Sequence, residues 1–141
     1  MNIIEINLIN QTLLEDFIKK IDSDNFRYYK NRDLSCLKNH FYTILLMINN
    51  ISVGYGHIDY NHLDKKYFLG ICILSNYQNN GYGNIIMNCL INKFNETFGL
   101  SELFLTVDKN NIKAIKLYKK FNFNIYFETN DFYLMKLTST K

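Results

Sequence analysis

The first apolar residues of the chain change their spacing from that of a strand to that of a helix. Residues 1–8 alternate roughly between apolar and polar positions, which predicts a β-strand. Thr12 and Glu15 have the spacing of a capping box, in which each side chain bonds a backbone N–H of the first helical turn. One helical face would then collect the apolar residues Leu13, Leu14, Phe17, Ile18 and Ile21. The chain is therefore expected to begin as a strand followed by an amphipathic helix.

The middle of the chain has the pattern of three consecutive strands. It follows a polar, irregular stretch at 22–39, within which a short helix is expected over about 33–40. Three segments rich in apolar residues come next, at 41–48, 52–60 and 67–74. Asn49 and Asn50 between the first two suit the tight turn of a hairpin. The nearly continuous apolar run at 67–74 indicates a strand that is buried on both faces.

The last third of the chain alternates between helical and strand patterns. Helices are expected at about 82–97 and 110–121, and strands at about 102–107, 123–128 and 132–137. The complete order is β-α-α-β-β-β-α-β-α-β-β. A three-strand meander followed by a βαβαβ arrangement predicts an α/β fold with a mixed sheet and helices on both faces.

Composition favours a single soluble domain over residues 1–141. Apolar residues make up 48% and charged residues 21%, and the net charge of +3 is spread without a block of like charge. We therefore expect no nucleic-acid partner. The chain start lacks a basic region before its apolar residues, and no apolar run could span a bilayer, so a cytoplasmic location without membrane association is expected. The cysteines and histidines lack zinc-ligand spacing, and no metal is expected.

The segment Gln78-Asn79-Asn80-Gly81-Tyr82-Gly83 joins a predicted buried strand to a predicted helix. Glycines at such a junction permit positive φ and close approach of a ligand, and a helix start presents unpaired N–H groups that attract anions. The sequence is not a Walker A loop, since no Gly-Lys-Ser/Thr follows, and the third glycine of a dinucleotide fingerprint is replaced by Ile86. Taken alone, the turn indicates either a phosphate site or ordinary turn chemistry.

A second motif lies in the helix expected at 110–121. Asn111, Ala114 and Tyr118 fall on one face of that helix, which leaves a shallow groove with polar ends. In this order and at this separation, the two motifs resemble those of the GNAT superfamily of N-acetyltransferases, as Gln78-x-x-Gly81-x-Gly83 followed by Asn111-x-x-Ala114-x-x-x-Tyr118. The chain departs from the family pattern at Asn122, where a glycine is usual, but Asn tolerates the left-handed conformation.

The resemblance implies a GNAT fold, with a central, mostly antiparallel seven-stranded sheet flanked by about four helices. It also implies acetyl-CoA as the acyl donor, in a ternary complex with the acceptor. The pyrophosphate would bind main-chain N–H groups of the glycine turn, at Gln78, Asn79, Asn80, Gly81, Tyr82, Gly83 and Asn84. Ile73 would supply a backbone N–H to the thioester oxygen, Asn111 would contact the pantetheine or pyrophosphate, and Tyr118 would protonate the departing thiolate.

The general base is not given by the resemblance. Many family members carry a glutamate on the strand before the glycine turn, but 67–74 contains no carboxylate. The best substitute is His57 on the preceding strand, with Asp59 on the same face at a spacing of two. A neutral imidazole suits deprotonation of an ammonium group. The alternative is a histidine that merely satisfies its neighbours in a strand.

The acceptor is expected to be the primary amine of a small polar molecule. In this family the loop after the first helix contributes to acceptor specificity, and here it carries Arg27 and Tyr28 among other aromatic and basic residues. With His57 and Asp59 these are the candidate acceptor-binding residues, and they suggest an anionic or polar acceptor such as a nucleotide-linked amino sugar. The alternatives are acetylation of protein N-termini, including ribosomal proteins, and a non-catalytic CoA-binding regulatory domain. A monomer and a homodimer are both compatible with the sequence.

Overall fold

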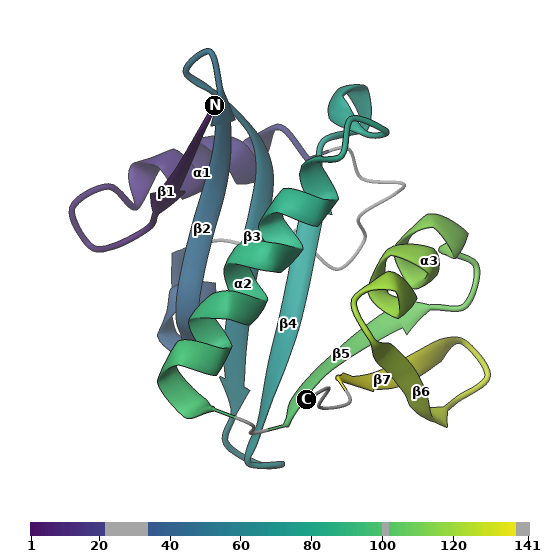
Figure 1. The fold of residues 1–141 in the computed structure, drawn as a ribbon. Helices are drawn as coiled ribbons and strands as arrows, with labels where there is room; N and C mark the ends of the chain where they lie inside the picture. The colour runs from purple at the N-terminus through teal and green to yellow at the C-terminus, as the bar shows by residue number, and fades with distance from the viewer. Residues whose placement is uncertain (22–33, 100–101, 138–141) are drawn as a thin grey trace.

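The computed structural model describes residues 1–21, 34–99 and 102–137, and the account below concerns this part of the chain. Its N-terminal half forms four antiparallel strands in sequence order (Figure 1). These are β1 (Asn2–Glu5), β2 (His40–Ile48), β3 (Ile51–Asn61) and β4 (Lys66–Ile73). Asn49 and Asn50 both have positive φ in the turn between β2 and β3, as the tight hairpin predicted there requires.

The C-terminal half adds three strands and completes the predicted seven-stranded mixed sheet. β5 (Leu103–Asp108), β6 (Phe123–Glu128) and β7 (Phe132–Leu137) follow the helices α2 (Tyr82–Phe98) and α3 (Ile112–Lys120). The order across the sheet is β1-β2-β3-β4-β5-β7-β6, in which β4 and β5 are parallel and all other neighbours antiparallel. This is the element order expected from the sequence.

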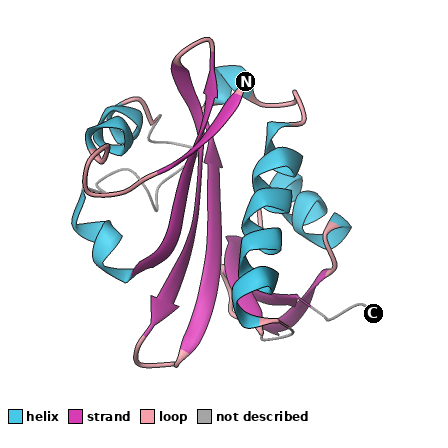
Figure 2. Ribbon diagram, turned by 60° about the vertical axis from the view of Figure 1, so that its left-hand side comes forward, coloured by secondary structure: helices cyan, strands magenta, loops and turns pink. Residues whose placement is uncertain are grey.

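Helices cover both faces of the sheet (Figure 2). On one face, α1 (Thr12–Lys19) and the 3-10 helix η1 (Leu34–Asn39) lie against β2 and β3. On the other face α2 crosses the middle strands, and the short 3-10 helix η2 (Ser75–Tyr77) leads from β4 toward it. Successive residues of β3 face opposite sides of the sheet. Tyr55 therefore packs on Phe17 of α1, while Gly54 and Gly56 lie against Ile86 of α2.

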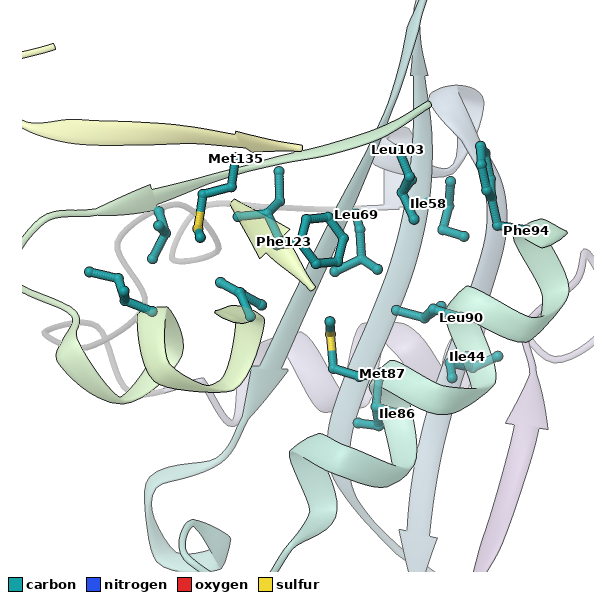
Figure 3. Close-up of a cluster of buried hydrophobic side chains, with 14 of the residues drawn as sticks. Ile44, Ile58, Leu69, Ile86, Met87, Leu90, Phe94, Leu103, Phe123 and Met135 are labelled. Atoms are coloured by element: carbon teal, nitrogen blue, oxygen red, sulfur yellow. The ribbon is translucent and has the colours of Figure 1, made fainter. Parts of the chain in front are cut away.

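The hydrophobic core is divided between these two faces. The larger cluster joins α2 to the sheet and continues to β5, β6 and β7 through Leu103, Phe123 and Met135 (Figure 3). The smaller cluster lies under α1 and includes Leu14, Phe17, Tyr55 and Cys72. β4 contributes Leu69 to the first cluster and Cys72 to the second, so the burial on both faces predicted from its apolar run is confirmed.

Two local predictions were wrong. Thr12 does not cap α1, because Gln11 precedes it in a helical conformation and the cap has no side-chain hydrogen bond. Side chains of Asn7 and Asn10 instead hold the turn that leads into the helix, as Asn10 Oδ1 accepts from Asn7 N at 2.8 Å and Asn7 Oδ1 from Ile9 N at 2.8 Å. The first strand also ends earlier than expected, at Glu5, since this asparagine turn begins there.

Candidate active site

The glycine turn adopts a conformation suited to an anion. Asn79 and Gly81 have φ values of 67° and 79°, and Gly81 is the residue before the first turn of α2. A Cβ on Gly81 would meet no atom of the described residues within 4 Å, so the glycine serves the left-handed backbone rather than close packing. The start of this 17-residue helix has no side-chain cap. Its first N–H groups are therefore directed toward the position where a phosphate would lie.

Side chains of the turn fasten it to the end of β4. Gln78 Nε2 donates to the carbonyl oxygen of Ile73 at 3.1 Å, and Asn80 Nδ2 donates to the carbonyl oxygens of Tyr77 and Gln78. The N–H of Gln78 itself contacts Ser75 O at 3.4 Å within η2. Of the turn residues expected to hold pyrophosphate, Gln78 and Asn80 thus have side chains that shape the turn.

Ile73 directs its backbone away from β3. The next residue, Leu74, donates its N–H to Val53 O on β3 at 2.9 Å. Because successive residues of a strand turn their N–H and C=O groups to opposite edges, Ile73 turns both groups toward the β5 side. The hydrogen bond from Gln78 to Ile73 O agrees with this orientation. The N–H of Ile73 is therefore available to the interval between the two strands.

β4 and β5 diverge along this interval. Their pairing is confined to Tyr67 with Leu103 and Phe68 with Phe104, and Figure 1 shows the two strands separating from there toward the glycine turn. The N–H and C=O groups of β4 beyond Phe68 that point toward β5 consequently lack a ladder partner on that strand. The two strands thus leave an interval of backbone without ladder pairing between them on the side of the glycine turn.

Tyr118 lies on α3, next to the diverging strands. Its side chain is 6% exposed and packs edge-on against Phe123 at a centroid distance of 6.2 Å. Burial raises the pKa of Tyr118, and Cys72 on β4 adds to the increase. Tyr118 belongs to the larger core cluster, which joins α2 to the sheet. A tyrosine in this environment stays protonated at neutral pH and can act as a proton donor.

α3 also presents two polar side chains near the start of α2. Asn111 Oδ1 accepts from Ala114 N at 3.3 Å, so Asn111 is the N-cap of α3 and has a structural task besides any contact with CoA. Lys120 Nζ donates to Asn84 Oδ1 at 3.0 Å, which brings a positive charge to the first turn of α2. Lys120 could not be identified from the sequence, because the spacing of residues on α3 does not reveal the packing of α3 on α2.

His57 and Asp59 meet as their spacing predicted. His57 is 4% exposed, and its Nδ1 lies 2.9 Å from Asp59 Oδ1 in hydrogen-bond geometry. His57 is paired in register with Gly70 of β4, which has no side chain to cover the imidazole. A hydrogen bond between Nδ1–H and the carboxylate fixes the tautomer in which Nε2 accepts a proton. This pair has the chemistry of a general base.

A second histidine, His40, lies next to the His57–Asp59 pair. His40 Nδ1 also contacts Asp59 Oδ1, at 2.5 Å, as an ion-pair contact without the alignment of a hydrogen bond. The rings of His40 and His57 lie parallel at a centroid distance of 4.5 Å. His40 Nε2 lies 2.6 Å from Tyr55 Oη, and Cys36 Sγ lies 3.8 Å from the same oxygen. Counting back from the Asn49-Asn50 turn could have placed His40 opposite Asp59, its register partner.

The charges of this cluster support one another. Burial by itself would raise the pKa of Asp59, but contacts with His40 and His57 outweigh it and hold the pKa well below its ordinary value. Burial would likewise lower the pKa of His40, but Asp59 and Cys36 outweigh it and the pKa is raised. At neutral pH the carboxylate is therefore ionised, and the surroundings of His40 favour its protonated form.

The donor atoms of His40, His57 and Asp59 lie within 4.8 Å of one another, a set of ligand types that transition metals bind. The contacts to Asp59 Oδ1 at 2.5 and 2.9 Å are nevertheless shorter than the separation of roughly 3.3 Å that tetrahedral zinc imposes on its ligands. We therefore interpret the cluster as side chains held by hydrogen bonding and charge.

An open hollow of about 410 Å³ lies beside Asp59, toward the turn between β3 and β4. Asp59 and Phe68, which are register partners, line it together with Asn39 and Asn61. Asp59 has 27% of its side chain exposed and so connects the buried histidines with this hollow. The predicted acceptor residues Arg27 and Tyr28 lie outside the described residues.

Comparison with known families decides what kind of protein carries this site. The family model described as "Acetyltransferase (GNAT) family" matches residues 6–123. The chain belongs to this GNAT family. It is accordingly an N-acetyltransferase, as its two motifs predicted. A comparison with curated protein sequences found no match. Within the described part of the chain, the helices are too short or too polar to cross a membrane.

Solved GNAT structures resemble the whole chain. The GNAT acetyltransferase of Streptococcus pneumoniae has a TM-score of 0.72 and 24% identity, covering 96% of this chain and 97% of that one. Campylobacter jejuni N-acetyltransferase PseH has a TM-score of 0.66 and 26% identity, covering 99% and 98%. The ribosomal-protein-S18-alanine N-acetyltransferase of Escherichia coli has a TM-score of 0.68 and 20% identity, covering 96% and 92%, and shows the fold alone.

Acetyl-CoA is supported as the donor by a second PseH structure, in complex with acetyl coenzyme A, to which this chain is 25% identical with a TM-score of 0.67. The GNAT assignment also explains the backbone at Asn122. This residue has a φ of 73°, the left-handed conformation for which the family uses glycine, so the tolerance predicted for asparagine is confirmed.

Proposed function

We propose that this GNAT enzyme transfers the acetyl group of acetyl-CoA to the primary amine of a small polar acceptor by direct attack in a ternary complex. The observation that carries the proposal is the order of features along β4. Phe68 borders the hollow beside Asp59, Gly70 is paired with His57, and Ile73 precedes the glycine turn. An acceptor in the hollow and a cofactor on the turn would thus approach each other near His57.

The cofactor half of the proposal rests on the backbone. The pyrophosphate binds the N–H groups from Asn79 to Asn84 at the uncapped start of α2, and Lys120 adds a positive charge there. Asn111, the N-cap of α3, stays a proposed contact for the pantetheine or pyrophosphate. The pantetheine arm enters between β4 and β5, and the N–H of Ile73 donates to the thioester oxygen as charge develops on it.

The reaction transfers one proton from the amine nitrogen to His57 and one proton from Tyr118 to the thiolate. An acceptor that arrives as an ammonium first releases one proton to solvent, and the neutral amine nitrogen then attacks the thioester carbonyl carbon. The Nε2 atom of His57 accepts the remaining proton that this nitrogen loses. The carbon–sulfur bond then breaks, and Tyr118 donates its phenolic proton to the departing thiolate. Burial raises the pKa of Tyr118, so the phenol still carries its proton at neutral pH when the thiolate departs.

The residues that line the hollow support a small polar amine as the acceptor. Asp59 attracts a protonated amine, the amides of Asn39 and Asn61 offer donors and acceptors for hydroxyl groups, and Phe68 offers a flat apolar surface. We therefore favour an amino sugar as the acceptor, and Arg27 and Tyr28 would extend the site if that sugar is linked to a nucleotide.

A panel of amines with acetyl-CoA tests the proposal. Thiol release and the mass of the product would be measured with amino sugars, nucleotide-linked amino sugars, polyamines and peptides with free N-termini. We expect amine-dependent release with an amino-sugar class and not with the others. Acetylation of peptides alone would identify a protein N-terminal acetyltransferase. Saturable CoA binding without transfer to any amine would identify a regulatory domain and contradict the proposal.

A further inference from the structure

His40 belongs to the buried cluster beside the proposed base, yet the chemical step gives it no task. His40 is the first residue of β2, and its side chain is 2% exposed. Its Nδ1 contacts the same carboxylate oxygen as Nδ1 of His57, and the two rings lie parallel within 1°. Because His40 is buried and contacts the Asp59 carboxylate, it influences which groups of the cluster are protonated.

One carboxylate can balance one positive charge. Two imidazolium rings stacked at 4.5 Å would repel each other, so the cluster favours a state with a single protonated histidine. In that state one imidazole ring carries a proton on both nitrogens and the other ring is neutral. The neutral ring is the one that can act as a base.

The contacts of His40 favour that ring as the charged one. Tyr55 Oη lies in hydrogen-bond geometry at Nε2, and the negatively charged Asp59 Oδ1 lies in ion-pair contact with Nδ1, so both nitrogens of an imidazolium at His40 would face an oxygen. The raised pKa of His40 agrees with this assignment. In the described part of the chain, the titratable groups in contact with His40 are Asp59, His57 and Tyr55 on β3 and Cys36 on η1.

We propose that His40 is a positioning residue that carries the positive charge of the His40–Asp59–His57 cluster and so keeps His57 neutral and ready to accept the proton of the amine. The inference rests on the proposed function of His57 as the base. Without the charge on His40, Asp59 would pair with His57 alone and favour its protonated, inactive form. His40 thereby extends the working range of the base to lower pH.

The location of the charge can be measured without any activity. Nitrogen chemical shifts of the histidine rings in the full chain at pH 7, assigned with His→Gln variants, report which ring nitrogens carry hydrogen. We expect His40 with both nitrogens protonated and His57 with hydrogen on Nδ1 only. A protonated His57 beside a neutral His40 would overturn the inference, whether or not an acceptor has been identified.

The pH dependence of kcat provides the second test. His40→Gln should move the acid limb of the profile to higher pH by about 1 unit, so that turnover falls about tenfold on that limb and approaches the parent value at high pH. KM for acetyl-CoA should not change. Asp59→Asn should not show this upward movement, because it removes the charge that favours protonation of either histidine.

Further variants separate charge from packing. Tyr55→Phe removes the oxygen facing His40 Nε2 and should move the acid limb in the same direction by less, which keeps the inference testable if His40→Gln does not fold. Tyr42→Phe is the matched control, since it removes a hydroxyl that contacts Cys89 on the α2 side. Loss of turnover by the same factor at every pH would show that His40 acts only in packing. Activity lost with EDTA and restored by Zn²⁺ would show a metal centre and also overturn the inference.

Discussion

Gln78 donates a hydrogen bond from Nε2 to the carbonyl oxygen of Ile73, 3.1 Å away, and so connects the glycine turn with the end of β4. The same bond helps to orient the backbone that is proposed to receive the thioester. The turn that is proposed to bind the pyrophosphate and the strand that is proposed to bind the acyl group are thus connected through one side chain.

Replacing Gln78 should therefore weaken the use of acetyl-CoA. Gln78→Ala removes one hydrogen bond, of about 1 kcal/mol, and should raise KM for acetyl-CoA roughly fivefold. KM for the acceptor should change less, because the hollow lies at the other end of β4. Gln11→Ala, at the start of α1, is the matched control and should leave both constants unaltered. Equal constants for Gln78→Ala and the parent enzyme would contradict the account.

Tyr118→Phe should lower kcat by about 10²-fold or more, since it removes the proton donor for the thiolate and little else. The dissociation constant for CoA, measured by calorimetry, should change less than twofold. Tyr133→Phe on β7 is the control and should keep full turnover, as its ring contact with Lys109 remains. If Tyr118→Phe turns over a verified acceptor at the parent rate, Tyr118 is not the acid.

Gly81 and Gly83 should respond differently to alanine. Gly81 has a φ of 79°, so Gly81→Ala should destabilise the fold by roughly 1–2 kcal/mol and weaken CoA binding. At Gly83 a Cβ would lie 3.0 Å from Leu117 Cδ2, the flexible end of a side chain, and alanine gains up to about 1 kcal/mol in helix propensity. Gly83→Ala should thus be closer to neutral in urea unfolding. The reverse order of stabilities would contradict the conformation of the turn.

Stability should depend on pH through His40. Its folded-state pKa is raised, so its contribution is fully present below the unfolded value of about 6.5 and is lost as the pH rises through the folded value. The difference in Tm between the parent and His40→Gln should narrow as the pH rises from about 6 to 9. Asp59, whose pKa is lowered, contributes above about pH 3.9 and loses its contribution only at lower pH. A difference that widens toward pH 9 would disagree with this account.

Much of the fold could be predicted because strand and helix periods differ clearly along this chain. The hairpin at Asn49 and Asn50 and the two-faced burial of β4 followed from local residues alone. The cap of α1 could not be predicted, since the asparagine turn before it competes with Thr12 for the backbone. Local spacing describes one element at a time and does not decide between such competing hydrogen bonds.

In the candidate site, too, some contacts could be predicted from local spacing and others could not. His57 and Asp59 share a strand, so their period of two was sufficient to bring them together. A count from the hairpin turn places His40 opposite Asp59, but its contact with Tyr55 Oη also depends on how the side chains pack in the assembled sheet. Lys120 depends on the packing of α3 against α2. Contacts of this kind require the assembled sheet and helices.

The central claim is that acetyl-CoA on the glycine turn acetylates a small polar amine with His57 as the base and Tyr118 as the acid. The most direct test is single-turnover acetyl transfer to the best amino-sugar acceptor by the parent enzyme, His57→Gln and Tyr118→Phe, each loaded with acetyl-CoA. We expect acetylated product from the parent, and rates lower by about 10²-fold or more in both variants with unchanged CoA binding. Parent-like rates in both variants, or no acetylated amine from the parent, would contradict the claim.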